Sequence, residues 1–179
     1  MRRSFGTAAA VLISWSALGG CYLGPDPVQI AALAVIDGRP TAVLAACGKT
    51  SVGVELSLDD AVEGQITRWS VTVDVPEGAE RVDVELFGKA RPGWDVTTEN
   101  TGGILSVVPL TAIEPGRSYL LDSANYGPEG SVAPRLAFTA ADLPRIGPGQ
   151  VLATAGRERS EIMSLDTFVD ERCRASLAE

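Results

Sequence analysis

The sequence of 179 residues contains no histidine, which excludes every mechanism that depends on an imidazole. Ser-His-Asp triads, Cys-His pairs and most catalytic zinc sites all need that side chain. Basic residues are also scarce, because 15 Lys and Arg stand against 23 Asp and Glu, and the net charge of −8 has the wrong sign for a nucleic-acid-binding surface. The usual motifs of hydrolases and nucleotide-binding proteins are missing as well. We therefore expect no nucleic-acid partner, no cofactor, no metal and no enzymatic activity.

The remaining composition is that of a folded protein. Hydrophobic residues make up 45 % of the chain and charged residues 21 %, which is enough apolar material for a core. The length suits one domain, and wholly disordered or low-complexity structures are excluded.

The N-terminus has the pattern of an export signal. Arg2 and Arg3 form a short positive region, and residues 7–18 are uncharged and mostly apolar. The segment Leu18-Gly19-Gly20-Cys21 resembles the lipobox of bacterial lipoproteins. This resemblance implies that residues 1–20 are removed as a signal peptide and that Cys21 carries lipid, with palmitate among its acyl chains.

Two alternatives remain at this point: an ordinary secretory signal with a chance cysteine, or an uncleaved membrane anchor. Arg2-Arg3-Ser4-Phe5 also partly resembles the twin-arginine export motif, so Sec and Tat export both stay open. Residues 21–27, rich in Gly and Pro, are expected to form a lipidated tether, and residues 28–179 the domain.

Removal of residues 1–20 leaves 13 basic and 23 acidic residues, a net charge of −10. Lipidation of Cys21 leaves two cysteines, and outside the cytoplasm such a pair predicts a disulfide between Cys47 and Cys173. The alternatives are two separate buried thiols, or a reactive Cys47 thiol beside Gly48 and Lys49.

Most of the domain alternates between apolar and polar residues with a period of two, which indicates half-buried strands. Asp37-Gly38 is a favoured hairpin turn. One C-terminal helix is expected, with Ser164 as its N-cap and an apolar face of Leu165, Phe168, Val169, Cys173 and Leu177. About nine strands are expected, at 28–36, 41–46, 52–58, 69–75, 82–86, 104–110, 118–124, 132–139 and 150–154.

The segment Ile113-Glu114-Pro115-Gly116-Arg117-Ser118-Tyr119-Leu120-Leu121 resembles the tyrosine corner of fibronectin type III and related immunoglobulin-like domains. It implies a mainly β fold, an immunoglobulin-like antiparallel β-sandwich here closed by the C-terminal helix, with Trp69 in the core. The layout of the chain also resembles small actinobacterial lipoproteins of unassigned activity.

Two loop aromatics, Trp94 and Tyr126, are candidate partner contacts, but an aromatic beside Pro-Gly more often just covers the open end of the core. The carboxylates that could do chemistry are predicted to be solvated, with a weak Ca²⁺ site as the alternative for the first three of them: Asp59, Asp60, Glu63, Asp74, Asp83, Glu85 and Asp95.

We interpret the chain as a monomeric lipoprotein on the outer face of the cytoplasmic membrane, held there by the lipid on Cys21. It is expected to act as a binding or envelope-structural module whose partner is an envelope protein or glycan. The alternatives are a carboxylate-dependent hydrolase of an envelope carbohydrate or ester, and a carrier of lipid or another apolar ligand.

Overall fold

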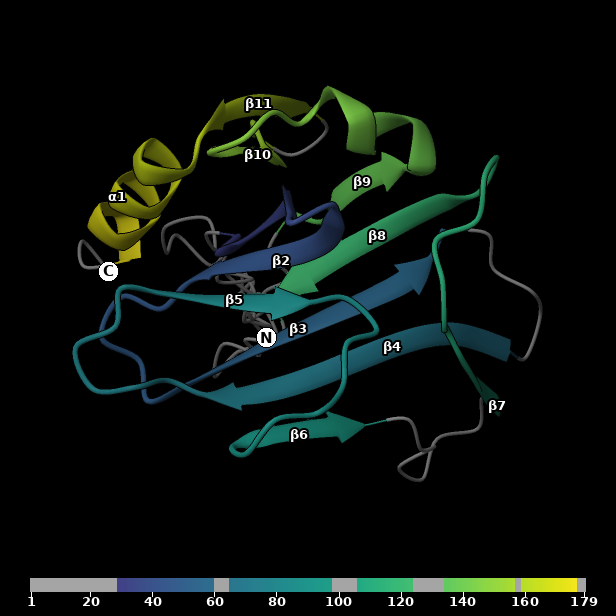
Figure 1. Cartoon of the computed structure of the whole chain (residues 1–179), viewed down its shortest axis with the longest axis horizontal. Coiled ribbons are helices and arrows are strands. Elements are labelled where there is room, and N and C mark those ends of the chain that lie inside the picture. Colours follow the sequence, from purple (N-terminus) through teal and green to yellow (C-terminus); the bar gives the residue numbers. More distant parts are fainter. Residues whose placement is uncertain (1–28, 60–64, 98–105, 124–133, 157–158, 177–179) are drawn as a thin grey trace, which may run out of the picture.

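The computed structural model describes residues 29–59, 65–97, 106–123, 134–156 and 159–176, which form two β-sheets and a C-terminal helix (Figure 1). All strands of the first sheet are antiparallel to their neighbours. Their order is β11 (Ser160–Ser164), β10 (Gln150–Thr154), β1 (Ala31–Ile36), β2 (Arg39–Ala45) and β5 (Arg81–Glu85).

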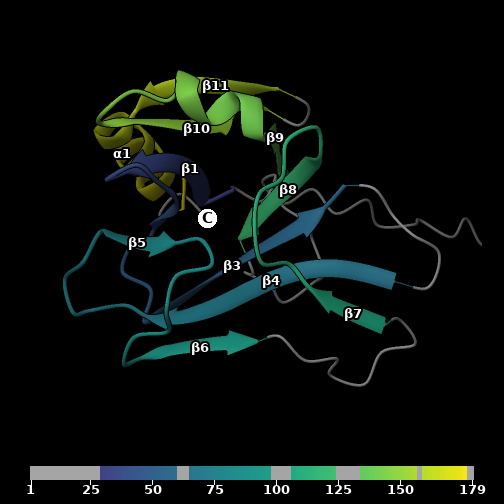
Figure 2. The same ribbon diagram turned by 45° about the vertical axis from the view of Figure 1, so that its right-hand side comes forward.

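The second sheet contains the remaining strands. β7 (Ser106–Pro109) runs parallel to β4, and every other pairing is antiparallel. The order of the main path is β6 (Trp94–Thr97), β4 (Gln65–Asp74), β3 (Ser51–Leu58), β8 (Ser118–Ser123) and β9 (Leu136–Thr139). Figure 2 shows the two sheets as separate layers. The predicted β-sandwich is therefore confirmed.

Six of the strands pair as in an immunoglobulin-like domain, while β6 and β7 lie between β5 and β8 in the chain and add to the second sheet. β1, β2 and β5 share one sheet, while β3, β8 and β9 share the other, as strands A, B, E and C, F, G do in that fold. The tyrosine corner is formed as predicted, because the Tyr119 hydroxyl accepts a hydrogen bond of 2.6 Å from the Glu114 backbone N–H. The ring of Tyr119 is fully buried and stacks on Phe138.

The predicted Asp37-Gly38 turn joins β1 to β2. Both residues have positive φ, 51° at Asp37 and 76° at Gly38, as a two-residue turn of type I′ requires. Since this turn matches the twist of the flanking strands, it sets the register in which Leu33 lies opposite Ala42.

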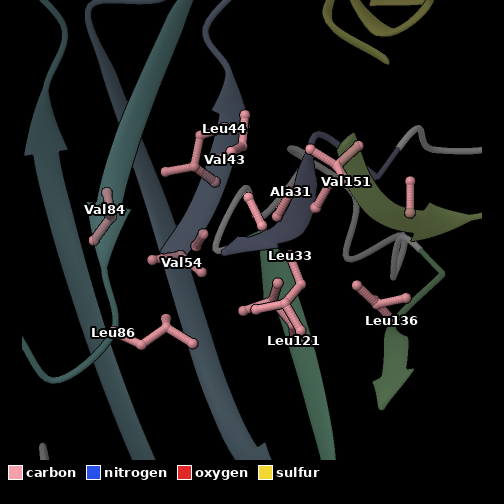
Figure 3. Packing of buried hydrophobic residues seen from close by; sticks show 14 of the residues in the cluster. Ala31, Leu33, Val43, Leu44, Val54, Val84, Leu86, Leu121, Leu136 and Val151 are labelled. Carbon is pink, nitrogen blue, oxygen red and sulfur yellow. The ribbon is translucent and has the colours of Figure 1, made fainter. Parts of the chain in front are cut away.

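Buried side chains of both sheets meet in one core, among them Leu33, Val84, Val54 and Leu121 (Figure 3). Trp69 belongs to this core, as predicted, and its ring lies edge-on against Phe87. The four residues 31–34 of β1 are all almost completely buried, so both faces of the first sheet are covered at its centre.

The cover on the outer face is α1 (Leu165–Ser176), which packs on β2, β10 and β11. Ser164 is its N-cap, as predicted, because its Oγ accepts a hydrogen bond from the Thr167 backbone N–H at 3.1 Å. Phe168 is fully buried and Val169 nearly so, while Leu177 lies outside the described residues. None of the helices in the described part of the chain has the length and apolar character needed to cross a membrane.

Three elements were not predicted: β6, β11 and the 3₁₀-helix η1 (Ala140–Arg145). β6 has only four residues, and β11 contains just two apolar ones, so neither shows a long alternation. η1 begins with a capping box, in which the Asp142 carboxylate accepts hydrogen bonds from the backbone N–H and the hydroxyl of Thr139. These hydrogen bonds lower the pKa of Asp142.

Candidate functional site

The predicted disulfide between Cys47 and Cys173 is confirmed. It joins the turn after β2 to the last turns of α1, with 4.8 Å between the two Cα atoms and a sequence separation of 126 positions. Cys47 and Gly48 both have positive φ, which turns the chain sharply from one sheet toward the other. Because both sulfurs are in the bridge, the alternatives of separate buried thiols and of a reactive Cys47 thiol are wrong for this state.

A groove of about 600 Å³ opens beside this bridge, between α1 and the segment that leads into β5. We call it the helix groove. Its helix side presents Leu165, Val169 and Cys173, and its other side is formed by residues around Glu80. The full lining is Gly78, Glu80, Arg81, Leu165, Asp166, Val169, Asp170 and Cys173.

The rim of the helix groove is acidic. Asp166 and Asp170 lie on α1, and Glu80 lies on the opposite side. Asp170 is hydrogen-bonded to Arg174, and Arg81 forms an ion pair of 3.2 Å with Asp83. Within the described part of the chain, no ion pair holds Glu80 or Asp166, so these two carboxylates give the groove its negative charge.

A second hollow, of about 430 Å³, lies on the outer face of the first sheet near the β1–β2 turn. Its residues are Ile36, Asp37, Arg39, Thr41, Asp83, Glu85 and Arg91. The Arg39 guanidinium donates to both carboxylate oxygens of Glu85, at 2.9 and 3.0 Å. Since the carboxylates of Asp83 and Glu85 are both paired with arginine, this hollow is a mixed-charge surface.

The predicted partner contacts have different outcomes. We expected Trp94 to lie in a loop, and this was wrong. It is the first residue of β6, because its segment pairs with β4 and extends the second sheet. Its ring is half-buried against the core, and the Arg91 guanidinium lies over it at 5.2 Å from the ring centre. Tyr126 lies outside the described residues, and so does Cys21.

The predicted carboxylates are spread over the molecule. Asp59 accepts a hydrogen bond from the Ser118 hydroxyl, Asp74 and Asp95 are exposed on the second sheet, and Asp60 and Glu63 lie outside the described residues. In the described segments, no group of three or more Asp, Glu or Cys side chains is arranged to hold a metal ion.

A pair of carboxylates on one face of the second sheet was missed by sequence reasoning. Glu55 of β3 and Asp122 of β8 lie directly opposite each other, and Arg68 and Arg135 pair with them at 3.5 and 3.3 Å. Burial raises the pKa of Asp122, Arg135 opposes that rise, and the charge of Glu55 adds to it. Only the strand register brings these residues together, so alternation along each strand alone could not have found the pair.

Comparison of the chain with protein-family models, curated proteins and solved structures found no match.

Proposed function

We propose that this chain is an exported lipoprotein, anchored by lipid on Cys21 to the outer face of the cytoplasmic membrane, and that its domain is a binding module. The observation that carries the proposal is the pairing of the cysteines. The bridge takes Cys47 and Cys173, so the one remaining cysteine of the chain is Cys21, directly after Leu18-Gly19-Gly20.

The disulfide supports export independently of the N-terminal pattern. Such bonds persist in oxidising compartments and are rare in the cytosol. The charge of −10 after removal of residues 1–20 repels anionic lipid headgroups. Adhesion to the membrane must therefore come from acyl chains, each buried methylene contributing about 0.8 kcal/mol.

The arrangement of carboxylates supports binding rather than hydrolysis. A carboxylate-dependent glycosidase needs a protonated acid and an ionised partner that face a substrate cleft. Burial raises the pKa of Asp122, but its side chain and that of Glu55 are each paired with an arginine on a sheet face that lines neither hollow. The exposed acids therefore fit a recognition surface better than a catalytic pair.

The test is intact mass spectrometry of the protein purified from the cell envelope, before and after reduction. We expect the mass of residues 21–179 plus acyl chains, and a gain of two hydrogens on reduction. The Cys21→Ala variant should lose the acyl mass and keep the two-hydrogen shift, whereas the Cys47→Ala/Cys173→Ala variant should keep the acyl mass and lose the shift. A wild-type protein that retains residues 1–20 without lipid would refute the anchor.

A further inference from the structure

We propose that the helix groove binds an extended peptide segment of an envelope protein, in which an apolar side chain stands next to Lys or Arg. This inference rests on the proposed function, since it names the class of partner that the binding module would take. Three features of the groove carry it: an apolar floor, an acidic rim and a fixed shape.

The floor is the apolar stripe of α1. Leu165, Val169 and Cys173 follow one another at intervals of four residues, which places them on one side of the helix. Leu165 and Val169 are only 9 % and 8 % exposed, so the stripe is mostly packed on the domain and only its edge lines the groove. The volume of about 600 Å³ lies within the range of ligand sites and accommodates a few side chains.

The acidic rim of the helix groove favours a ligand with positive charge. Asp166 and Glu80 stand on opposite sides of the groove, and neither is neutralised by an ion pair within the segments that the structure describes. Arg81, the one basic residue of the lining, is already paired with Asp83 outside the groove. A cationic side chain that enters the groove between these two carboxylates is therefore favoured, and anionic lipids and nucleic acids are repelled.

The groove is held in shape before any ligand arrives. Cys173 is bonded to Cys47, and the neighbouring Ala46 donates its backbone N–H to the Glu80 carbonyl oxygen at 2.7 Å, so the bridge and this hydrogen bond together tie the helix side of the groove to the strand side. A preformed groove spares the binding partner the cost of ordering its walls.

Other occupants fit less well. A small cation would use the rim but not the apolar floor. The chain's own tether after the lipidated cysteine, residues 22–27, has Asp26 as its only charged residue, which has the same sign as the rim. A second copy of the chain would bring a net charge of −10 against an acidic surface. A cationic and apolar segment of a different protein matches both the floor and the rim.

The experiment measures binding of three fluorescein-labelled heptapeptides to the full mature protein in non-ionic detergent, by fluorescence anisotropy. The first alternates Lys and Leu between terminal glycines, the second replaces Leu by Ser, and the third replaces Lys by Glu. We expect the Lys-Leu peptide to bind at least about tenfold more tightly than either control, and to weaken as salt is raised from low to high concentration.

Variants of the protein locate the site. Glu80→Lys/Asp166→Lys should weaken binding of the Lys-Leu peptide at least about tenfold, whereas Asp95→Lys, a single charge reversal on the exposed part of β6, should leave its Kd within about twofold. Figure 1 shows β6 on the side of the molecule away from α1. If the double reversal fails to fold, Glu80→Gln/Asp166→Asn, which keeps the shape of both side chains, serves in its place.

Each other outcome overturns the proposal. Equal binding of the Ser peptide would mean non-specific charge attraction, and equal binding to the double variant would place the site elsewhere. Binding that appears only after residues 22–27 are replaced by Gly and Ser would mean that the tether occupies the groove. Self-association that is lost in the double variant would mean that a second copy of the chain occupies it. The acyl mass is measured on the same preparation. A lipidated protein that binds none of the peptides therefore refutes the groove proposal and leaves the lipid anchor standing.

Discussion

Removal of the Cys47–Cys173 disulfide should cost the domain a large part of its stability. The bridge closes a loop whose two cysteines are 126 positions apart in the sequence. The chain-entropy relation for such a loop gives about 5 kcal/mol at 25 °C, the entropy that the cross-link removes from the unfolded chain. The whole stability of a domain is typically about 5–15 kcal/mol, so the variant should be marginal.

The assay is urea unfolding of the mature protein and of the Cys47→Ala/Cys173→Ala variant, followed by far-UV circular dichroism and by tryptophan fluorescence, to which the buried Trp69 and the half-buried Trp94 contribute. We expect the free energy of unfolding to fall by about 3–5 kcal/mol, because measured effects often stay below the entropic value. The double substitution is used so that no lone thiol remains. A reductant should destabilise the wild-type protein and leave the variant unchanged, which provides the control.

The location of the bridge makes a second readout decisive. Since the bond holds α1 on the first sheet, hydrogen exchange in the variant should rise first at the amides of α1, such as Phe168, and later in β1 and β2. A loss below about 1 kcal/mol, with α1 still protected, would refute the reasoning, because it would mean that Leu165, Phe168 and Val169 hold the helix without the covalent tie.

Two further predictions concern single residues. Tyr119→Phe removes the hydroxyl that accepts from the Glu114 N–H in the tyrosine corner, and should lower the free energy of unfolding in urea by about 1–2 kcal/mol; an unchanged value would mean that the hydrogen bond is dispensable. Burial raises the pKa of Asp122 above its ordinary 3.8, so the folded protein holds that proton more tightly than the unfolded chain does, and stability falls as pH rises through the folded value. The free energy of unfolding of Asp122→Asn, measured relative to wild type in the same assay, should therefore increase between pH 3 and pH 7. A difference between variant and wild type that decreases as the pH rises would contradict the raised pKa of Asp122.

The main features of the fold could be predicted because each depends on a short segment of the sequence. The alternation of Val52, Val54 and Leu56 is a property of one strand, the Asp37-Gly38 turn needs two residues, and the tyrosine corner needs nine. The disulfide was predictable for a different reason: once Cys21 is assigned to lipid, only one intramolecular pair remains.

The features that were missed depend on which strands become neighbours. β6 is a strand because β4 offers it a free edge, although its own four residues carry little signal. Glu55 and Asp122 form a pair because β3 and β8 are adjacent with one particular register. Neither fact can be read from a single segment, since strand pairing joins residues far apart in the sequence.

Buried polar contacts between segments escaped prediction for the same reason. Gln29 was expected to be an ordinary residue of the first strand, yet its side chain is buried and joins the entrance of β1 to β8 in the other sheet. Its amide donates to the Leu121 carbonyl at 3.1 Å, and its oxygen accepts from the Ser123 N–H at 3.1 Å. A glutamine in an apolar run gives no sign of which backbone groups it will satisfy.

The bridge links the stability of the domain to the helix groove. The same bond that constrains the unfolded chain also positions Cys173 in the groove lining, so α1 can form one wall only while it stays docked on the first sheet. Any ligand that binds this wall adds to the docking free energy of the helix, because it binds the folded arrangement and not the released one. Disulfide formation and ligand binding therefore both favour the docked position of α1. We expect the groove to be fully formed in an oxidising compartment, which is where the N-terminal segment is proposed to direct the chain.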